Sequence, residues 1–186
     1  MIHFVGAGPG AADLITVRGE RFLREADAVI YAGSLVNPGL LEVCKPGCRI
    51  FDSASMTLEA VIAEMQKAEA AGETTVRLHT GDPCIYGAIR EQMDKLDELG
   101  IAYDVCPGVS SFCGAAAALR AEYTLPGVSQ SVILTRMEGR TPMPEGEKLH
   151  MLASHGATMV IFLSAGMLEN VAVDLIAGGY SADTPA

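Results

Sequence analysis

Long hydrophobic runs are absent from this chain of 186 residues. The longest apolar stretches, such as 159–163 and 115–119, fall far short of the roughly 20 residues that a helix needs to cross a bilayer. The sequence opens directly on an apolar strand pattern, without the basic segment and cleavable apolar helix of a secretory signal. We therefore expect no membrane span and no secretion.

Positive charge is scarce as well, because 13 lysines and arginines stand against 23 acidic residues, for a formal net charge of −10. Binding to nucleic acid depends on clustered lysine and arginine, which are scattered here. The imbalance also disfavours an anionic membrane surface. A small anionic ligand is not excluded, since a local pocket of arginine and backbone amides can hold one. We expect no nucleic-acid partner and no membrane partner.

The chain also lacks the clusters of cysteine and histidine that hold metal ions. Its five cysteines are irregularly spaced and lie mainly in apolar surroundings, which is typical of reduced thiols in a cytosolic protein. Cys44 and Cys48 form a close pair, but no second pair and no histidine cluster accompanies them. We expect no metal bound by the protein and a cytoplasmic location.

What the sequence does contain is ample apolar material, 49% of its residues, arranged as alternating strand and helix patterns. This alternation predicts an α/β fold with a parallel sheet. Thr57 is a plausible N-cap and Gly72 a plausible helix end. The helix at 110–119 carries small apolar side chains on all sides, so we expect it to be buried on most sides. The patterns predict strands at 2–7, 28–31, 49–52, 74–80 and 102–106, and helices at 14–25, 57–72, 88–99 and 110–119.

The pattern resets at 121–126, where we expect a domain boundary. We assign 1–121 to an N-terminal α/β domain and 122–186 to the start of a C-terminal α/β domain. In the second part the patterns predict strands at 128–137 and 159–164, and helices at 149–154 and 168–177. Two strands are too few for a good sheet. We therefore expect that the second unit either leans on the first or is C-terminally truncated.

The segment Gly81-Asp-Pro-Cys-Ile-Tyr-Gly87 joins a predicted strand to a predicted helix. Proteins of the α/β class place their ligands at such turns. The two glycines permit backbone angles or close approaches that a Cβ would block, and Pro83 fixes φ and removes an amide donor. The same residue types form ordinary tight turns, so this segment alone leaves a ligand loop and a plain turn both open.

A second glycine-rich loop, Gly6-Ala-Gly-Pro-Gly-Ala11, follows the first strand and matches the G-x-G-x-x-A pattern of dinucleotide-binding folds. Such folds carry an acidic residue at the end of the second strand to hold the ribose hydroxyls. Here that strand ends at Tyr31, and Asp27 precedes it instead. An NAD-linked oxidoreductase is therefore a disfavoured alternative.

Three motifs occur in order along the chain: Val5-Gly-Ala-Gly-Pro-Gly10 with Asp13-Leu-Ile-Thr16, then Gly81–Gly87, then Pro107-Gly-Val-Ser-Ser111. In order and spacing they resemble the tetrapyrrole methylase family, which uses S-adenosylmethionine. Within that family, Tyr31-Ala-Gly-Ser-Leu-Val36 and Tyr123-Thr-Leu-Pro-Gly127 look like the precorrin-4 (carbon 11) methyltransferases of cobalamin biosynthesis. The resemblance covers essentially the whole chain.

This resemblance implies two α/β domains with the methyl donor in the cleft between them, usually in a homodimer. At the position of Ser164 many relatives have the sequence Tyr-Met-Gly, from which this chain departs. Relatives also continue beyond Ala186, so the chain looks truncated. The contacts to S-adenosylmethionine that the resemblance implies are Pro9, Thr80, Gly81, Asp82, Ile85, Ser110, Ser111 and Ser164.

Several of these residues also have a purely structural interpretation. Asp82 can accept hydrogen bonds from a ribose hydroxyl, from the ammonium group of the methionine, or from the amides of its own turn. Ser110 and Ser111 stand near a predicted helix start, where a hydroxyl caps the helix and the same amides can bind a carboxylate. The sequence leaves these alternatives open.

The activity implied is transfer of a methyl group to carbon 11 of precorrin-4 or cobalt-precorrin-4, a small-molecule tetrapyrrole substrate. The reduced tetrapyrrole supplies an electron-rich carbon, so we expect no catalytic side chain and a role in proximity and alignment. The nearest alternative is a sibling enzyme acting on another precorrin or on uroporphyrinogen III; a diphthine synthase is less favoured. Candidates by position for pairing with substrate carboxylates are Arg90, Arg120, Arg136 and Arg140.

Overall fold

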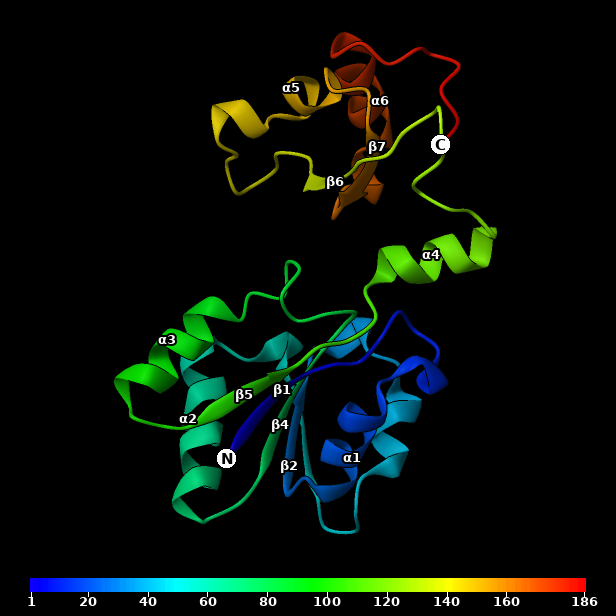
Figure 1. Ribbon diagram of the computed structural model, residues 1–186. Coiled ribbons are helices and arrows are strands. Elements are labelled where there is room, and N and C mark those ends of the chain that lie inside the picture. The colour runs from blue at the N-terminus through cyan, green and yellow to red at the C-terminus, as the bar shows by residue number, and fades with distance from the viewer. The chain divides into compact units, whose positions relative to one another are not determined.

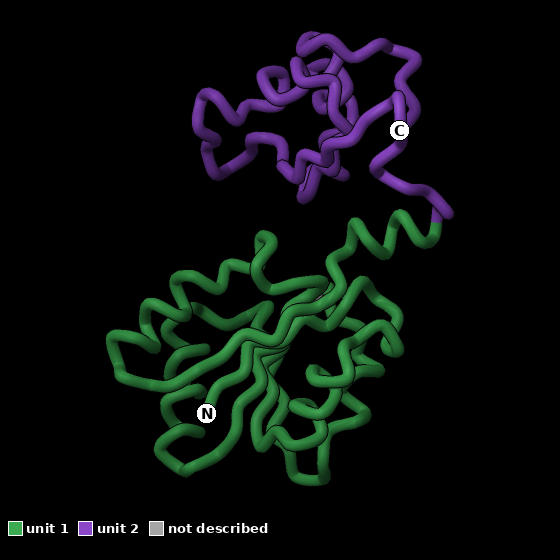
Figure 2. The backbone as a smooth tube through the Cα atoms, viewed as in Figure 1, with its two compact units in different colours: residues 1–118 green, residues 119–186 purple. Residues whose placement is uncertain are grey.

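The computed structural model describes residues 1–186, apart from the side chain of Ser34. The chain divides into two compact units, Met1–Ala118 (unit 1) and Leu119–Ala186 (unit 2), which Figure 2 draws in different colours. The division falls between residues 118 and 119, whereas the sequence pattern places the domain boundary between 121 and 122.

Unit 1 contains a five-stranded sheet in the order β3-β2-β4-β1-β5, in which all neighbouring strands are parallel (Figure 1). Each strand lies within one residue of its predicted bounds at both ends, and the predicted parallel sheet is confirmed. The strands are β1 (Ile2–Gly6), β2 (Ala28–Tyr31), β3 (Arg49–Asp52), β4 (Thr75–His79) and β5 (Tyr103–Cys106).

Threonine caps fix the starts of two helices. The Thr16 hydroxyl accepts a hydrogen bond from the Gly19 amide at 3.1 Å, so the first helix begins at residue 17, not at the expected residue 14. Thr57 caps the second helix in the same way. The helices are α1 (Val17–Glu25), α2 (Leu58–Ala70), α3 (Arg90–Glu98) and α4 (Ser111–Leu119); 3-10 turns occupy Ala12–Leu14, Gly33–Leu35, Pro38–Val43 and Ser53–Ser55.

Both faces of the sheet are covered, by α1 on one side and by α2 and α3 on the other (Figure 1). Alternate side chains of each strand serve the two faces, because successive residues of a strand point in opposite directions. Leu23 of α1 belongs to the core cluster that contains Val5, Val29, Val76 and Leu78. The cluster on the other face contains Ile2, Phe4, Ile30, Val61, Ile62, Met65 and Leu96.

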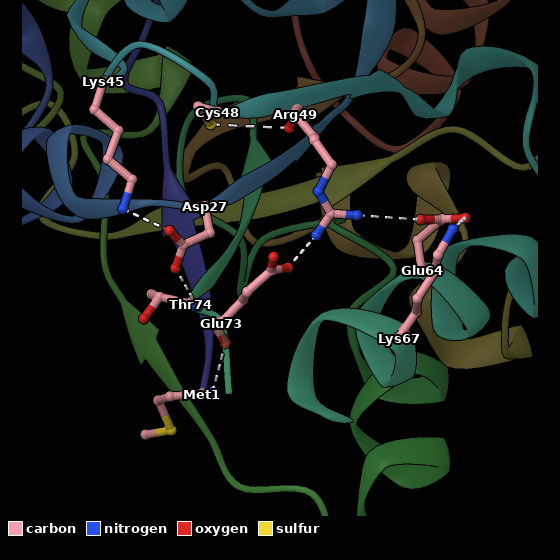
Figure 3. Close-up of polar contacts among 9 residues, drawn as sticks. All are labelled: Met1, Asp27, Lys45, Cys48, Arg49, Glu64, Lys67, Glu73 and Thr74. Atoms are coloured by element: carbon pink, nitrogen blue, oxygen red, sulfur yellow. Dashed lines mark hydrogen bonds and ion pairs between the residues drawn. The ribbon is translucent and has the colours of Figure 1, made fainter. Parts of the chain in front are cut away.

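Charged side chains pair with one another at the amino ends of the strands (Figure 3). Asp27, just before β2, lies 2.6 Å from the ammonium group of Lys45, and this contact lowers the pKa of the Asp27 carboxyl. Arg49, at the start of β3, pairs with Glu73 and lies 3.8 Å from a carboxylate oxygen of Glu64. Both Lys45 and Arg49 thus have carboxylate partners at this edge.

Helix α4 differs from its prediction, because none of its nine residues, all of them described, is buried. A helix made of small apolar residues has no polar face, but such a sequence does not specify which part of the protein covers the helix. One close approach is clear within unit 1. A Cβ added at Gly114 would lie 2.5 Å from the Cβ of Pro9, so this glycine lets the loop after β1 reach the helix.

Unit 2 contains a two-stranded parallel sheet of β6 (Val132–Arg136) and β7 (Thr158–Phe162), together with α5 (Leu149–Ala153) and α6 (Leu168–Ala177). The bounds of α6 agree with the prediction. Strand β6 begins four residues later than predicted. The Leu125 amide donates a hydrogen bond to the Ser129 carbonyl at 2.8 Å, which holds residues 125–129 in a turn. Across the described part of both units, no helix is long and apolar enough to span a bilayer.

Candidate active site

Three loops converge at the carboxyl edge of the unit 1 sheet, because they follow the neighbouring strands β4, β1 and β5. Gly8, after β1, and Gly81, after β4, form an antiparallel bridge with N···O distances of 2.9 and 3.2 Å. The chain leaves β1 toward α1 and leaves β4 toward α3 on the opposite face (Figure 1). Such a divergence at the carboxyl edge is where α/β folds bind ligands.

Glycines make this convergence possible. A Cβ at Gly108, in the loop after β5, would lie 2.1 Å from the carbonyl oxygen of Gly81 and 2.7 Å from the Cα of Gly6. No side chain fits in these gaps unless the loops move apart. Gly81 also has a φ of 58°, in the left-handed region that favours glycine. The glycines of the three motifs therefore pack the loops against one another.

Asp82 links two of these loops through both oxygens of its carboxylate. One oxygen accepts a hydrogen bond from the Cys84 amide at 2.8 Å, which is the bond within its own turn that the sequence left open. The other accepts one from the Gly108 amide at 2.9 Å, which joins the loop after β4 to the loop after β5. A carboxylate has further lone pairs, so these bonds leave capacity for a ligand.

The loop after β4 contains two strained residues. Tyr86 and Ala88 have φ values of 55° and 50°. Residues other than glycine adopt this backbone conformation at a cost of about 1–3 kcal/mol each. The positive φ at Ala88 also explains why α3 begins at Arg90, two residues later than predicted. Strain of this kind persists where the surroundings impose it, and it is common at ligand-binding loops.

The structure brings all but one of the predicted cofactor contacts to this edge. Ser110 is buried and its carbonyl accepts the Cys113 amide at 3.0 Å, so it stands at the start of α4. Thr80 and Ile85 are half-buried, and Ser111 is exposed. The residues that the three loops bring together are Pro9, Thr80, Gly81, Asp82, Ile85, Ser110 and Ser111.

Ser164 lies in unit 2, two residues after the end of β7. Its buried hydroxyl donates a hydrogen bond to the Phe162 carbonyl at 2.7 Å and accepts one from the Met137 amide at 2.9 Å. These bonds tie the ends of β6 and β7 together. The structure therefore gives Ser164 a structural role, while a contact with a cofactor stays a prediction.

Arg77 is not among the residues that the motifs predict, although it lies buried beside this edge. Its Nε donates to Oε1 of Gln92 on α3 at 3.0 Å, and its Nη1 donates to the Ile30 carbonyl at 3.1 Å. His79, two residues on, faces the same side of β4 and stacks on the Phe4 ring. The signal in the sequence is the polar alternation of Thr-Val-Arg-Leu-His in a strand that is buried at every position.

Burial dominates the electrostatics of these two side chains. It lowers the pKa of Arg77 to about 10, and it lowers the pKa of His79 to about 3 with a further contribution from the charge of Arg77. At neutral pH Arg77 is charged and His79 is neutral. The pKa of the Cys84 thiol is raised, first by burial and then by the charge of Asp82, so this thiol stays protonated.

Hollows of the described residues lie in both units. One of about 300 Å³ lies in unit 1 and is lined by Arg77, His79, Thr80 and Tyr86, among others. A larger one of about 530 Å³ lies in unit 2, lined by residues of 128–133 and 155–157. None of the predicted site residues lines the larger hollow, so we place the site at the carboxyl edge of unit 1.

Two of the four arginines predicted to pair with substrate carboxylates have partners within the chain. Arg90 pairs with Asp94 on the surface of α3, and Arg136 donates to carbonyl oxygens of its own loop, such as that of Thr141 at 3.1 Å. Arg120 and Arg140 are exposed in unit 2. Among the described residues, no group of three or more His, Cys, Asp or Glu is placed to hold a metal ion.

Comparisons with known proteins agree along the whole chain. A family model described as Tetrapyrrole (Corrin/Porphyrin) Methylases matches residues 1–186. A cobalt-precorrin-4 C(11)-methyltransferase of Methanocaldococcus jannaschii is 56% identical over 184 residues, which is 99% of this chain and 71% of the relative. A precorrin-4 C(11)-methyltransferase of Mycobacterium tuberculosis is 48% identical over 185 residues, 99% of this chain and 74% of the relative. The solved structure of a cobalt precorrin-4 methyltransferase, a cobalamin biosynthetic enzyme, matches with a TM-score of 0.95 and 48% identity, covering 98% of this chain and 77% of that one.

Proposed function

The chain belongs to the tetrapyrrole (corrin/porphyrin) methylases, and from this premise we propose that it methylates carbon 11 of precorrin-4 or cobalt-precorrin-4 in cobalamin biosynthesis. The observation that carries the proposal is the match to a solved cobalt precorrin-4 methyltransferase, with a TM-score of 0.95 over 98% of this chain. Relatives with and without cobalt in their names match almost equally far along the chain, so both forms of the substrate are included.

The methyl donor of this family is S-adenosylmethionine, whose sulfonium supplies an electrophilic methyl group. The carboxyl edge of unit 1 fits such a molecule, because bare glycine backbone lies beside the carboxylate of Asp82 and the hydroxyls of Thr80 and Ser111. These groups suit ribose hydroxyls, an ammonium and a carboxylate. The residues that we propose as contacts are Pro9, Thr80, Gly81, Asp82, Ile85, Ser110, Ser111 and Ser164.

The chain's own residues would contribute position and not covalent chemistry. The Cys84 thiol is protonated and His79 is buried and neutral, so neither is suited to act as a nucleophile. Asp82 and the packed glycines hold three loops in a fixed arrangement. Fixed loops orient bound reactants before reaction, and well-oriented reactants reach effective molarities of about 10⁵ M or more.

The resemblance also supports finer proposals about the organisation of the protein. We propose domains at 1–121 and 122–186, a homodimeric assembly, a cytoplasmic location and no nucleic-acid or membrane partner. Sedimentation equilibrium of the purified chain tests the assembly, with a monomer at all concentrations as the contradicting result.

The activity is tested with the purified chain, S-adenosylmethionine carrying a carbon-13 methyl group, and precorrin-4 or cobalt-precorrin-4 under anaerobic conditions. We expect one added methyl group by mass spectrometry, and its position at carbon 11 by nuclear magnetic resonance. Uroporphyrinogen III serves as the competing substrate, and its methylation instead would favour the sibling activity. Methylation at another carbon of precorrin-4, or of neither substrate, would overturn the proposal.

Cofactor binding is tested separately by calorimetry with S-adenosylhomocysteine and with NAD. We expect saturable binding of the first compound and none of the second. Gly81→Val and Asp82→Ala should abolish or weaken the binding, because a β-branched residue at Gly81 is strained at a φ of 58° and the loss of the Asp82 carboxylate frees the Gly108 amide. Gly139→Val is the matched control, since a Cβ at Gly139 meets nothing within 4 Å. Saturable NAD binding would support the oxidoreductase alternative.

A further inference from the structure

The hollow of unit 1, which is open to solvent on one side and is called the chamber from here on, lies beside the loop after β4. The proposed contacts to the methyl donor leave most of its lining unused. Its volume is about 300 Å³ and it belongs entirely to unit 1. Residues of β4, α2, α3 and the loops after β2, β3 and β4 line it. The polar residues of its lining are Ser53, Thr57, Arg77, His79, Thr80, Tyr86, Glu91 and Gln92.

Arg77 is the buried cation of this chamber, with only 7% of its surface exposed. Its guanidinium donates hydrogen bonds to neutral acceptors, the side-chain amide of Gln92 and the carbonyl of Ile30. Among the described residues, no carboxylate lies within ion-pair distance of its guanidinium. A buried charge without a counter-charge is unfavourable, so an anion that entered would be attracted strongly.

The contrast with Arg49 shows that this chain does pair its arginines elsewhere. Arg49 is more exposed than Arg77, yet it pairs with Glu73 and lies 3.8 Å from Glu64 (Figure 3). Arg77 is the more buried of the two and has Gln92 where a glutamate of similar size would supply the counter-charge. The absence of a negative charge beside Arg77 indicates that a bound ligand supplies the negative charge.

His79 supplies a second, independent observation. It is 4% exposed, it lines the chamber beside Arg77, and its Nε2 is buried without a hydrogen-bond partner among the described residues. An unsatisfied buried nitrogen is costly unless a partner arrives. The imidazole is neutral, so the tautomer protonated at Nε2 can donate to an anion without adding a second charge.

We propose that this chamber is a carboxylate-binding subsite, in which Arg77 receives one acetate or propionate arm of the tetrapyrrole substrate and His79 donates a second hydrogen bond. The identity of the arm rests on the proposed function. A macrocycle of four rings is much too large for the chamber, whereas a single carboxylate arm fits its volume. The planar guanidinium matches a carboxylate in geometry as well as in charge.

Glu91 gives the proposal a sensitive test, because it lines the same chamber and is exposed on α3. Its negative charge opposes an incoming carboxylate. Replacing it by glutamine keeps its size, and the exposed position carries little of the fold. Glu91→Gln should therefore tighten binding of an anion by about 2- to 5-fold if the chamber is an anion site.

The direct experiment is a titration of the nitrogen-15-labelled chain with sodium propionate, against sodium chloride at equal ionic strength. Nuclear magnetic resonance follows the Arg77 Nε–H signal and the His79 ring signals. We expect saturable shifts with propionate alone, tighter binding in Glu91→Gln and no saturable shift in Arg77→Met. Lys95→Met removes an exposed charge from the same helix and should bind like the unaltered chain.

In the enzyme assay, Arg77→Met should raise the KM for the tetrapyrrole by about 10- to 100-fold, the loss expected for a charged hydrogen bond. Its affinity for S-adenosylhomocysteine should not change. Arg77→Lys keeps the charge and should recover part of the loss. If Arg77→Met does not fold, the Glu91→Gln titration decides the question.

The two proposals fail in different ways. Saturable propionate binding without methylation of any tetrapyrrole would overturn the proposed function and keep the subsite. Methylation with an unchanged KM in a folded Arg77→Met variant would overturn the subsite and keep the function. Equal shifts with propionate and chloride, or a Glu91→Gln variant that binds propionate like the unaltered chain, would also overturn the subsite.

Discussion

The two units use the same strand and helix patterns, yet they bury their sheets to very different degrees. Every residue of β4 in unit 1 is buried, whereas every residue of β7 in unit 2 is only half-buried. Unit 1 has five strands with helices on both faces, and unit 2 has two strands. Large apolar side chains exposed in unit 2 include Val128, Leu134, Leu163, Leu168, Val173 and Ile176.

This difference teaches that a local pattern makes an element but the number of neighbouring strands makes a core. A central strand is covered by strands on both sides and by helices above and below, while a two-stranded sheet has only edges. A small unit also buries a smaller fraction of its surface. Unit 1 should therefore supply most of the stability of the chain.

Separating the units should have the largest effect. We expect a fragment of residues 1–119, which keeps all of α4, to unfold cooperatively in urea. A fragment of residues 120–186 should show no cooperative transition, because its sheet lacks a buried strand. Circular dichroism measures both. Hydrogen exchange of the intact chain is the control, and stronger protection in β6 and β7 than in β1 and β4 would contradict the comparison.

Two buried leucines, one in each unit, allow the stability of the two cores to be compared directly. Leu96 of α3 is 0% exposed in unit 1 and Leu149 of α5 is 3% exposed in unit 2. Replacing either by alanine should cost about 2–5 kcal/mol of unfolding free energy. We expect Leu96→Ala at the upper end, since the surrounding sheet cannot collapse into the cavity, and Leu149→Ala at the lower end. Urea denaturation measures both, and the reverse order would count against a rigid unit 1.

Substitution of a glycine should likewise have a larger effect in unit 1 than in unit 2. Gly108→Ala places a Cβ 2.1 Å from the Gly81 carbonyl oxygen, so it should cost about 1–3 kcal/mol by overpacking and weaken binding of S-adenosylhomocysteine. Gly139→Ala, in open space in unit 2, is the control and should leave both properties nearly unchanged. Denaturation and calorimetry provide the readouts. An undisturbed Gly108→Ala variant would mean that the loops do not need this close approach.

Acid should destabilise unit 1 through His79. His79 has a pKa of about 3 in the folded chain, against an ordinary value of 6.5, so the unfolded chain binds more protons between these values. The stability contributed by neutral His79 is full above pH 6.5 and falls as the pH drops toward 3, by at most about 1.4 kcal/mol per pH unit.

The measurement is urea denaturation of the unaltered chain and of His79→Gln at pH 7 and pH 5. The loss of stability between these two values should be smaller in the variant, because glutamine does not titrate. Asp27 also loses a stabilising contribution in acid, but its pKa is lowered from 3.8, so that loss falls mainly below pH 4. Equal slopes in the two proteins would show that His79 does not titrate as expected.

Much of unit 1 was predictable because its signals are local. The strands at 28–31 and 49–52 and the caps at Thr16 and Thr57 follow from short apolar runs and hydroxyls at helix starts. The delayed start of α3 was not predictable, because the positive φ at Ala88 depends on how the preceding loop packs. The exposure of α4 was missed for a similar reason, since its small apolar residues do not identify what covers them.

The candidate site was also predictable from the sequence only in its local features. The sequence by itself determined the glycine motifs, their order and the family that they resemble, because spacing along a chain is a local property. Only the tertiary structure decided that Asp82 reaches Gly108, and that Arg77 meets Gln92 inside a chamber with His79. The physical reason is that parallel neighbours β4, β1 and β5 bring distant segments to one edge. Burial at that edge lowers the pKa of both Arg77 and His79.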